Sequence, residues 1–123
     1  MKVAISSIEK DLESQVDARF GRGSYFLIVE IEDKKIKSVK VIKNTAVSQI
    51  GGAGISAAEI VANEEVNAVI TANLGPRAFS VFNQFGIKIY QGQGKIKDVV
   101  QKFIGGKLIQ ITDSTGQQHV GLK

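Results

Sequence analysis

The chain has 123 residues, 43% of them hydrophobic, and a formal net charge of +4 at pH 7. This length suits one domain with a packed core of two or three layers. The sequence contains no cysteine, which excludes disulfides, thiolate nucleophiles and cysteine-ligated zinc or iron–sulfur sites. No segment reaches the roughly 18 apolar residues of a membrane span, and no signal peptide is recognisable, so we expect a cytoplasmic protein.

The first part of the chain predicts a strand, a long polar connection and a β-hairpin. Residues 2–6 form the strand, and residues 7–24 form the connection, whose length in a compact domain is often functional. The hairpin comprises residues 25–31 and 36–42. It contains five lysines, which are Lys34, Lys35, Lys37, Lys40 and Lys43. Lysines in this number indicate a sheet edge that is protected against aggregation.

The middle of the chain predicts a helix and then a βαβ unit. The first helix follows the glycine turn 51–54 and ends near residue 63, with Ile55, Ala58 and Ala62 on its apolar face. Residues 66–71 and 87–90 read as buried parallel strands. They flank a helix that starts at Pro76, a proline position that helices tolerate. Its expected apolar residues, spaced i, i+4 and i+7, are Ala78, Phe82 and Phe85.

The last part of the chain predicts a third helix and a polar tail. The helix has the apolar stripe Ile96, Val99, Val100 and Phe103, and two glycines at 105–106 end it. Residues 108–111 are a candidate short strand. We expect an ordered domain over residues 1–111 and a flexible polar tail over residues 112–123.

Three glycine-containing turns and the arginines predict a site for an anion. In an α/β sheet, the turns after parallel strands meet at one edge, and helix N-termini there attract anions together with arginine. The turn 51–54 is neither a Walker A loop nor a dinucleotide fingerprint, because the required spacing is absent. The predicted binding residues are Arg19, Phe20, Gly21, Arg22, Gly51, Gly52, Gly54, Asn73, Gly75 and Arg77.

Catalytic and metal-binding sets are not visible in the sequence. His119 is the only histidine and lies in the predicted tail, so a Ser/His/Asp device or a two-histidine metal site is excluded. The carboxylates Asp11, Asp17, Glu30 and Glu32 are scattered, and none lies on the first strand, where two-metal nuclease chemistry would need one. We therefore expect no enzyme activity, no catalytic residue and no metal ligand.

The ordered series of motifs resembles the dinitrogenase iron-molybdenum cofactor biosynthesis family, which includes NifX, NafY and the C-terminal domain of NifB. The resemblance covers residues 1–111. It rests on the segments FGR at 20–22, YFLIV at 25–29, GGAG at 51–54 with Ala57 and Ala58, VNAVI at 66–70, LGPRAF at 74–79 and GIKIY at 86–90.

This resemblance implies a ribonuclease H-like α/β fold, in which helices cover both faces of a five-stranded mixed sheet. It also implies binding or carriage, without turnover, of an iron-molybdenum cofactor or a related iron–sulfur precursor. Cluster-assembly proteins would then be partners, and Arg19, Arg22 and Arg77 would hold the anionic charge of the cluster.

Two alternatives remain open beside the carrier. Soft metals prefer thiolate or imidazole ligands, so a small-anion or nucleotide-binding regulatory module without metal stays possible in a chain that has no cysteine. Nucleic-acid binding is the weaker alternative. It rests on the pI of 9.4 and on fold analogy. The basic hairpin lacks the interleaved aromatic residues that stack on bases.

Overall fold

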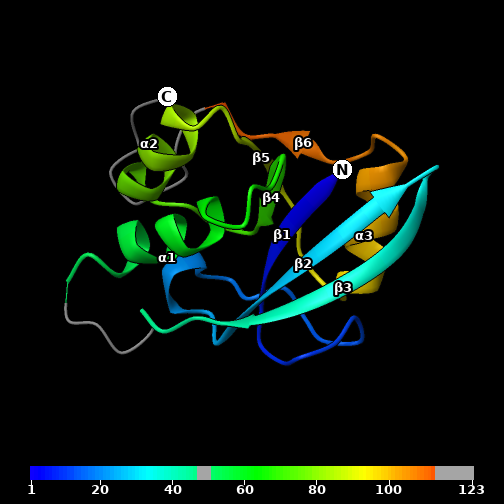
Figure 1. Cartoon of the computed structure of the whole chain (residues 1–123), viewed down its shortest axis with the longest axis horizontal. Coiled ribbons are helices and arrows are strands. Elements are labelled where there is room, and N and C mark those ends of the chain that lie inside the picture. The colour runs from blue at the N-terminus through cyan, green and yellow to red at the C-terminus, as the bar shows by residue number, and fades with distance from the viewer. Residues whose placement is uncertain (47–50, 113–123) are drawn as a thin grey trace.

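The computed structural model describes residues 1–46 and 51–112 (Figure 1). Within them the chain forms one mixed β-sheet with helices on both faces. The strands are β1 (Lys2–Ser7), β2 (Tyr25–Glu32), β3 (Lys35–Lys43), β4 (Ala68–Thr71), β5 (Lys88–Gln91) and β6 (Ile109–Gln110). The helices are α1 (Ala53–Ala62), α2 (Pro76–Gln84) and α3 (Ile96–Ile104), together with the short 3-10 helix η1 (Phe20–Arg22).

The strand order is β3-β2-β1-β4-β5-β6. β1 pairs parallel with β4 and β4 pairs parallel with β5, whereas the β1–β2, β2–β3 and β5–β6 pairs are antiparallel. The prediction that the first strand lies between the hairpin and the strand of the βαβ unit is therefore confirmed. This order follows from short connections and right-handed crossovers, which leave few other arrangements.

The prediction of five strands, with residues 87–90 at the far edge, is wrong. β6 pairs with the outer side of β5, and the Ile111 N–H donates a hydrogen bond to the Ile89 carbonyl over 2.7 Å. The chain can return to β5 because Gly106, at φ 70°, reverses it after α3. That the fold is ribonuclease H-like stays a prediction.

Two hydrophobic clusters lie on opposite faces of the sheet. One packs beneath α1 and α2 and includes Phe26 and Phe82, both fully buried. The other packs beneath α3, where Ile96, Val99 and Val100 are buried as predicted. Strand β1 supplies both clusters because successive side chains of a strand point to opposite faces. The helices α1 and α2 are thereby fixed side by side at one end of the sheet (Figure 1).

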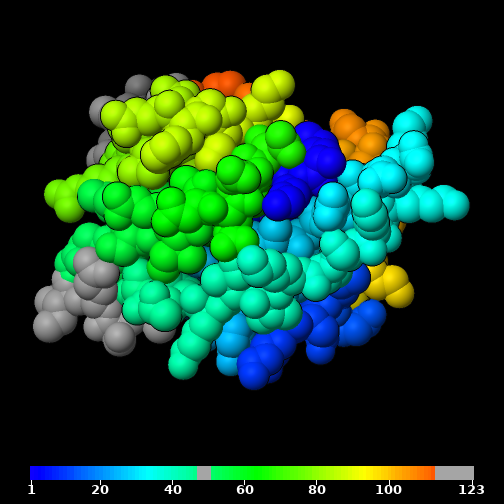
Figure 2. Space-filling view, viewed as in Figure 1, coloured from blue at the N-terminus to red at the C-terminus, as the bar shows by residue number. Residues whose placement is uncertain are grey.

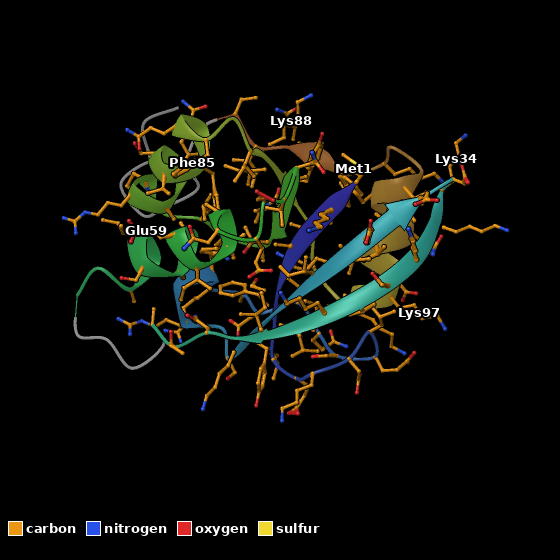
Figure 3. All side chains as sticks on the ribbon, in the orientation of Figure 1. Met1, Lys34, Glu59, Phe85, Lys88 and Lys97 are labelled. Carbon is orange, nitrogen blue, oxygen red and sulfur yellow. The ribbon has the colours of Figure 1, made fainter. Side chains whose placement is uncertain are left out.

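Two details of the predicted helix faces are wrong. Phe85 is 64% exposed, because α2 ends at Gln84 and the chain leaves the helical path before Gly86; Figure 3 shows its side chain at the end of that helix. In α1, Ala58 is buried as predicted and Ala62 packs against the same core, but Ile55 is only half-buried and lies outside that cluster. The fully buried side of α1 instead contains Ala57 and Val61.

The lysine hairpin forms an edge of the sheet, as predicted. Its turn consists of Asp33 and Lys34, both with positive φ, which matches the twist of a tight antiparallel hairpin. β3 is the terminal strand in the sheet order, and seven of its nine residues are exposed. None of the helices in the described part of the chain is long and apolar enough to cross a membrane.

Candidate functional site: an arginine-lined pocket

A pocket of about 420 Å³ opens where η1, α1 and the turn before α2 meet. It is lined by Arg19, Phe20, Gly21, Arg22, Gly52, Ala53, Gly54, Ile55, Asn73, Leu74, Gly75, Pro76, Arg77 and Ala78. All three arginines of the sequence are in this lining, and their side chains are exposed at its rim. No described residue of the lining is acidic, so the charge of the pocket is positive.

Two helices begin at this pocket. The lining includes the N-cap and the first three residues of α1, Gly52 to Ile55, and the same positions of α2, Gly75 to Ala78. Neither N-cap residue makes a side-chain capping hydrogen bond. N–H groups of a first helical turn have no partner within the helix and carry its positive dipole end. Both helices therefore direct their anion-attracting ends to the same cavity.

The floor of the pocket is apolar and rigid. Leu74, Ala78 and Phe20 are at most 4% exposed. The Phe20 ring lies 5.1 Å from the Phe26 ring and 5.3 Å from the Phe82 ring, so the lining continues directly into the core beneath α1 and α2.

Two asparagines fix the loops that carry the arginines. The Asn44 side-chain amide is fully buried and donates hydrogen bonds to the carbonyls of Gly21 and Gly23, over 3.3 and 2.8 Å. The Asn73 amide donates to the Ala18 carbonyl over 3.0 Å and so ties the turn before α2 to the loop of Arg19. These bonds hold the backbone on either side of Arg19 and Arg22, although the arginine side chains themselves are exposed.

A glycine contact closes the pocket between η1 and α1. A Cβ atom on Gly21 would lie 3.0 Å from both the Cα and the N of Gly54. Backbone atoms cannot move aside at low cost, so only glycine permits this approach at position 21. The contact brings Arg22 next to the start of α1.

Comparison with known proteins assigns the chain to a family. The model of a family described as "Dinitrogenase iron-molybdenum cofactor" matches residues 1–106. The chain belongs to that family. The family resemblance inferred from the sequence is therefore confirmed.

Relatives of the chain match it over nearly its whole length. The uncharacterized protein MJ0580 of Methanocaldococcus jannaschii is 39% identical over 110 residues, covering 88% of this chain and 93% of that protein. The apo form of the orange protein from Desulfovibrio gigas superposes with a TM-score of 0.87 at 26% identity, covering 94% and 96% of the two chains. TM1290 from Thermotoga, a candidate NifB protein, gives a TM-score of 0.80 at 32% identity, covering 94% and 97%.

The structure brings together nearly all the residues that the sequence nominated in this family member. Nine of the ten line the one pocket, including the three arginines and Asn73. Gly51 does not line it, because it precedes the N-cap of α1 by one residue. Whether the nine bind a ligand stays a prediction. His119 lies outside the described residues, as does most of the predicted tail.

Sequence reasoning missed two kinds of site residue. The apolar lining residues Ala53 and Leu74 lie within the predicted turns, and Ile55 directly follows one, so proximity in sequence was the available signal. Asn44 gave no signal, because it reaches the turn 20–23 only through the pairing of β3 with β2. Among the described residues, no group of three or more His, Cys, Asp or Glu side chains could hold a metal ion.

Proposed function

We propose that this protein binds and carries an anionic iron-molybdenum-type metallocluster, or its precursor, as cargo in the arginine-lined pocket and does not turn it over. The observation that carries the proposal is the convergence of three arginines and two uncapped helix N-termini on one cavity. Membership of the dinitrogenase iron-molybdenum cofactor family supports the identity of the cargo.

The pocket suits an anion larger than a single ion. Its volume of about 420 Å³ lies within the usual range of ligand pockets, roughly 300–1,000 Å³. Arginine forks and backbone N–H groups can contact several oxygen or sulfur atoms of one polyatomic anion at once. The apolar floor of Leu74 and Ala78 would face the less charged part of the cargo.

The side chains of the pocket hold cargo through charge and hydrogen bonds. The described lining offers guanidinium, amide and N–H donors but no thiolate, imidazole or carboxylate. Contacts of this kind do not replace a ligand on the metal, so release requires no metal–ligand bond to break. Such release suits a protein that hands its cargo to a cluster-assembly partner.

Binding of isolated iron-molybdenum cofactor under anaerobic conditions tests the proposal. Retention is measured after gel filtration as molybdenum and iron per protein chain. We expect retention by the unmodified protein, and we expect Arg77→Glu or Arg22→Glu to weaken binding by about 1–3 kcal/mol or more, the range for charge-assisted contacts. Arg77→Lys should give an intermediate loss because it keeps the charge but not the fork.

A matched charge reversal controls for net charge. Lys102→Glu alters an exposed residue of α3, on the other face of the sheet, and should leave retention unchanged. Thermal unfolding should shift little in all these variants, because the substituted side chains are exposed. His119→Ala should also retain the cluster; loss of iron and of visible absorption in that variant would show a histidine ligand that the proposal does not include.

The metal-free alternative predicts a different result. The two helix N-termini would attract any suitable anion, so orthophosphate and ATP are titrated in parallel. Binding of either at the arginines, with no retention of the cluster, would support the regulatory anion-binding module instead. Metal-dependent cleavage of RNA or DNA by the pure protein, abolished by one Asp or Glu substitution, would refute the carrier.

A further inference from the structure

Strand β3 presents a long open edge to solvent. It is the terminal strand of the sheet, and no strand among the described residues pairs with its outer side. Figure 1 shows it running along the outside of β2, and Figure 2 shows its turquoise atoms uncovered along the same face. In an antiparallel pair, alternate residues of an edge strand direct their N–H and C=O groups away from the partner. β3 therefore offers a template of backbone donors and acceptors.

The side chains of this edge are cationic and partly apolar. The sequence of β3, KIKSVKVIK, contains four lysines and no acidic residue. Val39 and Val41 are 37% and 41% exposed and lie on the same face, opposite Val29 and Leu27 of β2. The register with β2 shifts at Lys37, and the strand is regular from Ser38 to Lys43. An added strand could therefore make both charged and apolar contacts with this edge.

The ion pairs at this edge leave part of the charge uncompensated. Lys37 pairs with Glu32 over 3.0 Å, and Lys40 pairs with Glu64 over 2.9 Å. Lys35 and Lys43, near the two ends of β3, make no ion pair with another described residue. A strand added to β3 would therefore meet positive charge without an ion-pair partner at Lys35 and at Lys43.

A second copy of this chain fits the edge poorly. Full-length antiparallel pairing of two β3 strands would be centred on Val39. It would place Lys35 of each copy opposite Lys43 of the other, and the two strands would share no acidic residue. Like charges directly opposite each other in a sheet are destabilising. Charge complementarity instead favours an acidic partner.

We propose that β3 is a docking edge for an extended acidic segment of another protein, which adds to the sheet as a further strand. Backbone hydrogen bonds would supply the general affinity, and carboxylates near Lys35 and Lys43 would supply the selectivity. Nucleic acid fits less well, because neither arginine nor an aromatic side chain lies on β3 to fork a phosphate or stack on a base. This inference does not depend on what the pocket binds.

Fluorescence anisotropy with a labelled synthetic peptide tests the docking edge. The peptide has the length of β3 and alternates glutamate with valine or threonine. The protein is used without cargo. We expect saturable binding, which is lost when the peptide carries N-methyl groups at alternate residues, because these remove backbone donors while preserving charge. Equal binding of the N-methylated peptide would show that charge alone causes the binding, and it would overturn strand addition.

Charge-reversal variants locate the binding. Lys35→Glu combined with Lys43→Glu should weaken peptide binding by about tenfold or more, since two favourable charge contacts become repulsive. Lys88→Glu combined with Lys107→Glu makes the same change of net charge at exposed lysines away from β3, and should alter binding much less. Equal losses in both variants would contradict the proposal. Arg77→Glu should not affect the peptide, which separates this test from the cargo test.

Two further measurements cover the remaining outcomes. In the unmodified protein, bound peptide should slow amide hydrogen exchange at alternate residues of β3; protection elsewhere, or none, would overturn the assignment even if the lysine variants fail to fold. A thymidine oligonucleotide is titrated in parallel. Tighter binding of the oligonucleotide than of the peptide, abolished by Lys35→Glu and Lys43→Glu, would assign the edge to nucleic acid instead.

Discussion

Two positively charged regions of this molecule differ in side chain, shape and support. The pocket carries all three arginines, at η1 and at the start of α2, beside buried residues such as Phe20 and Leu74. The β3 edge carries four lysines on a strand that is largely exposed. A guanidinium is a rigid fork for several anionic atoms, whereas a lysine is a mobile and strongly hydrated point charge. The net charge of +4 is therefore spread over two different regions. The concave pocket is suited to a compact anion, and the extended edge is suited to contact with water or with an added strand.

The same contrast explains why the pI alone is a poor guide to function. The pI of 9.4 suggests nucleic acid if the charge is treated as uniform. The arginines instead gather at one cavity and the lysines of the hairpin at one sheet edge. Neither group is interleaved with exposed aromatic side chains, because Phe20 in the pocket lining is buried and β3 contains no aromatic residue.

The largest expected difference between the two regions is in the free energy of unfolding lost when a side chain is truncated. Phe82 is fully buried and packs edge-to-face with Phe20 at 5.3 Å. Phe82→Ala should lower the free energy of unfolding by about 3–5 kcal/mol, the cost of a large cavity in a core. Val41→Ala in β3, where the side chain is 41% exposed, should cost less than about 1 kcal/mol. Urea denaturation measures both free energies of unfolding, and similar costs would contradict the contrast between the buried floor of the pocket and the exposed side chains of β3.

A smaller effect is expected at the glycine contact that closes the pocket. Gly21→Ala would bring Cβ to 3.0 Å from the backbone of Gly54 and should cost about 1–3 kcal/mol, as overpacking does. Gly51→Ala is the matched control, because its Cβ would meet no atom within 4 Å, and it should change stability by less than about 0.5 kcal/mol. Thermal unfolding compares the two, and a silent Gly21→Ala would show that η1 can move away from α1.

The smallest effect is expected at the lysine edge. The Lys40–Glu64 pair, 2.9 Å apart, is exposed on the lysine side, so Lys40→Ala should cost at most about 1 kcal/mol. The cost should disappear in about 1 M salt, where the Debye length falls to about 3 Å. Lys35→Ala removes a lysine that has no ion pair with a described residue and should show no such salt dependence. A salt-independent loss at Lys40 would indicate packing of its aliphatic chain rather than charge.

Local patterns were sufficient for most elements and for the nomination of the site. Apolar runs predicted the strands, and the stripe of Ile96, Val99 and Val100 predicted α3 correctly, because helical spacing and burial coincide there. The turn residues Gly52 and Gly75 were found because glycine before an apolar helix marks a helix start, and both are N-caps. The place of the turn before α2 could be predicted because connections after parallel strands meet at one edge, whereas the turn before α1 follows β3, which pairs antiparallel with β2.

Other features depended on tertiary contacts that no local pattern encodes. The sequence spacing of Phe85 predicts a buried residue, but Phe85 is exposed because α2 ends one residue before it. Residues 108–111 were a candidate strand from the sequence, but the pairing of β6 with the outer side of β5 requires the rest of the sheet to be assembled. Asn44 supports the arginine loop only through a hairpin that brings positions 23 residues apart into contact.

Hydrophobic period, turn chemistry and residue identity are local properties, and they were enough to predict the class of fold, the family, the central place of the first strand and the residue types of the site. Folding then brought some of those residues into one cavity, placed Gly21 against Gly54 and left β3 as an open edge. These outcomes depend on packing and strand pairing between distant segments, and their free energies arise only when the chain has folded.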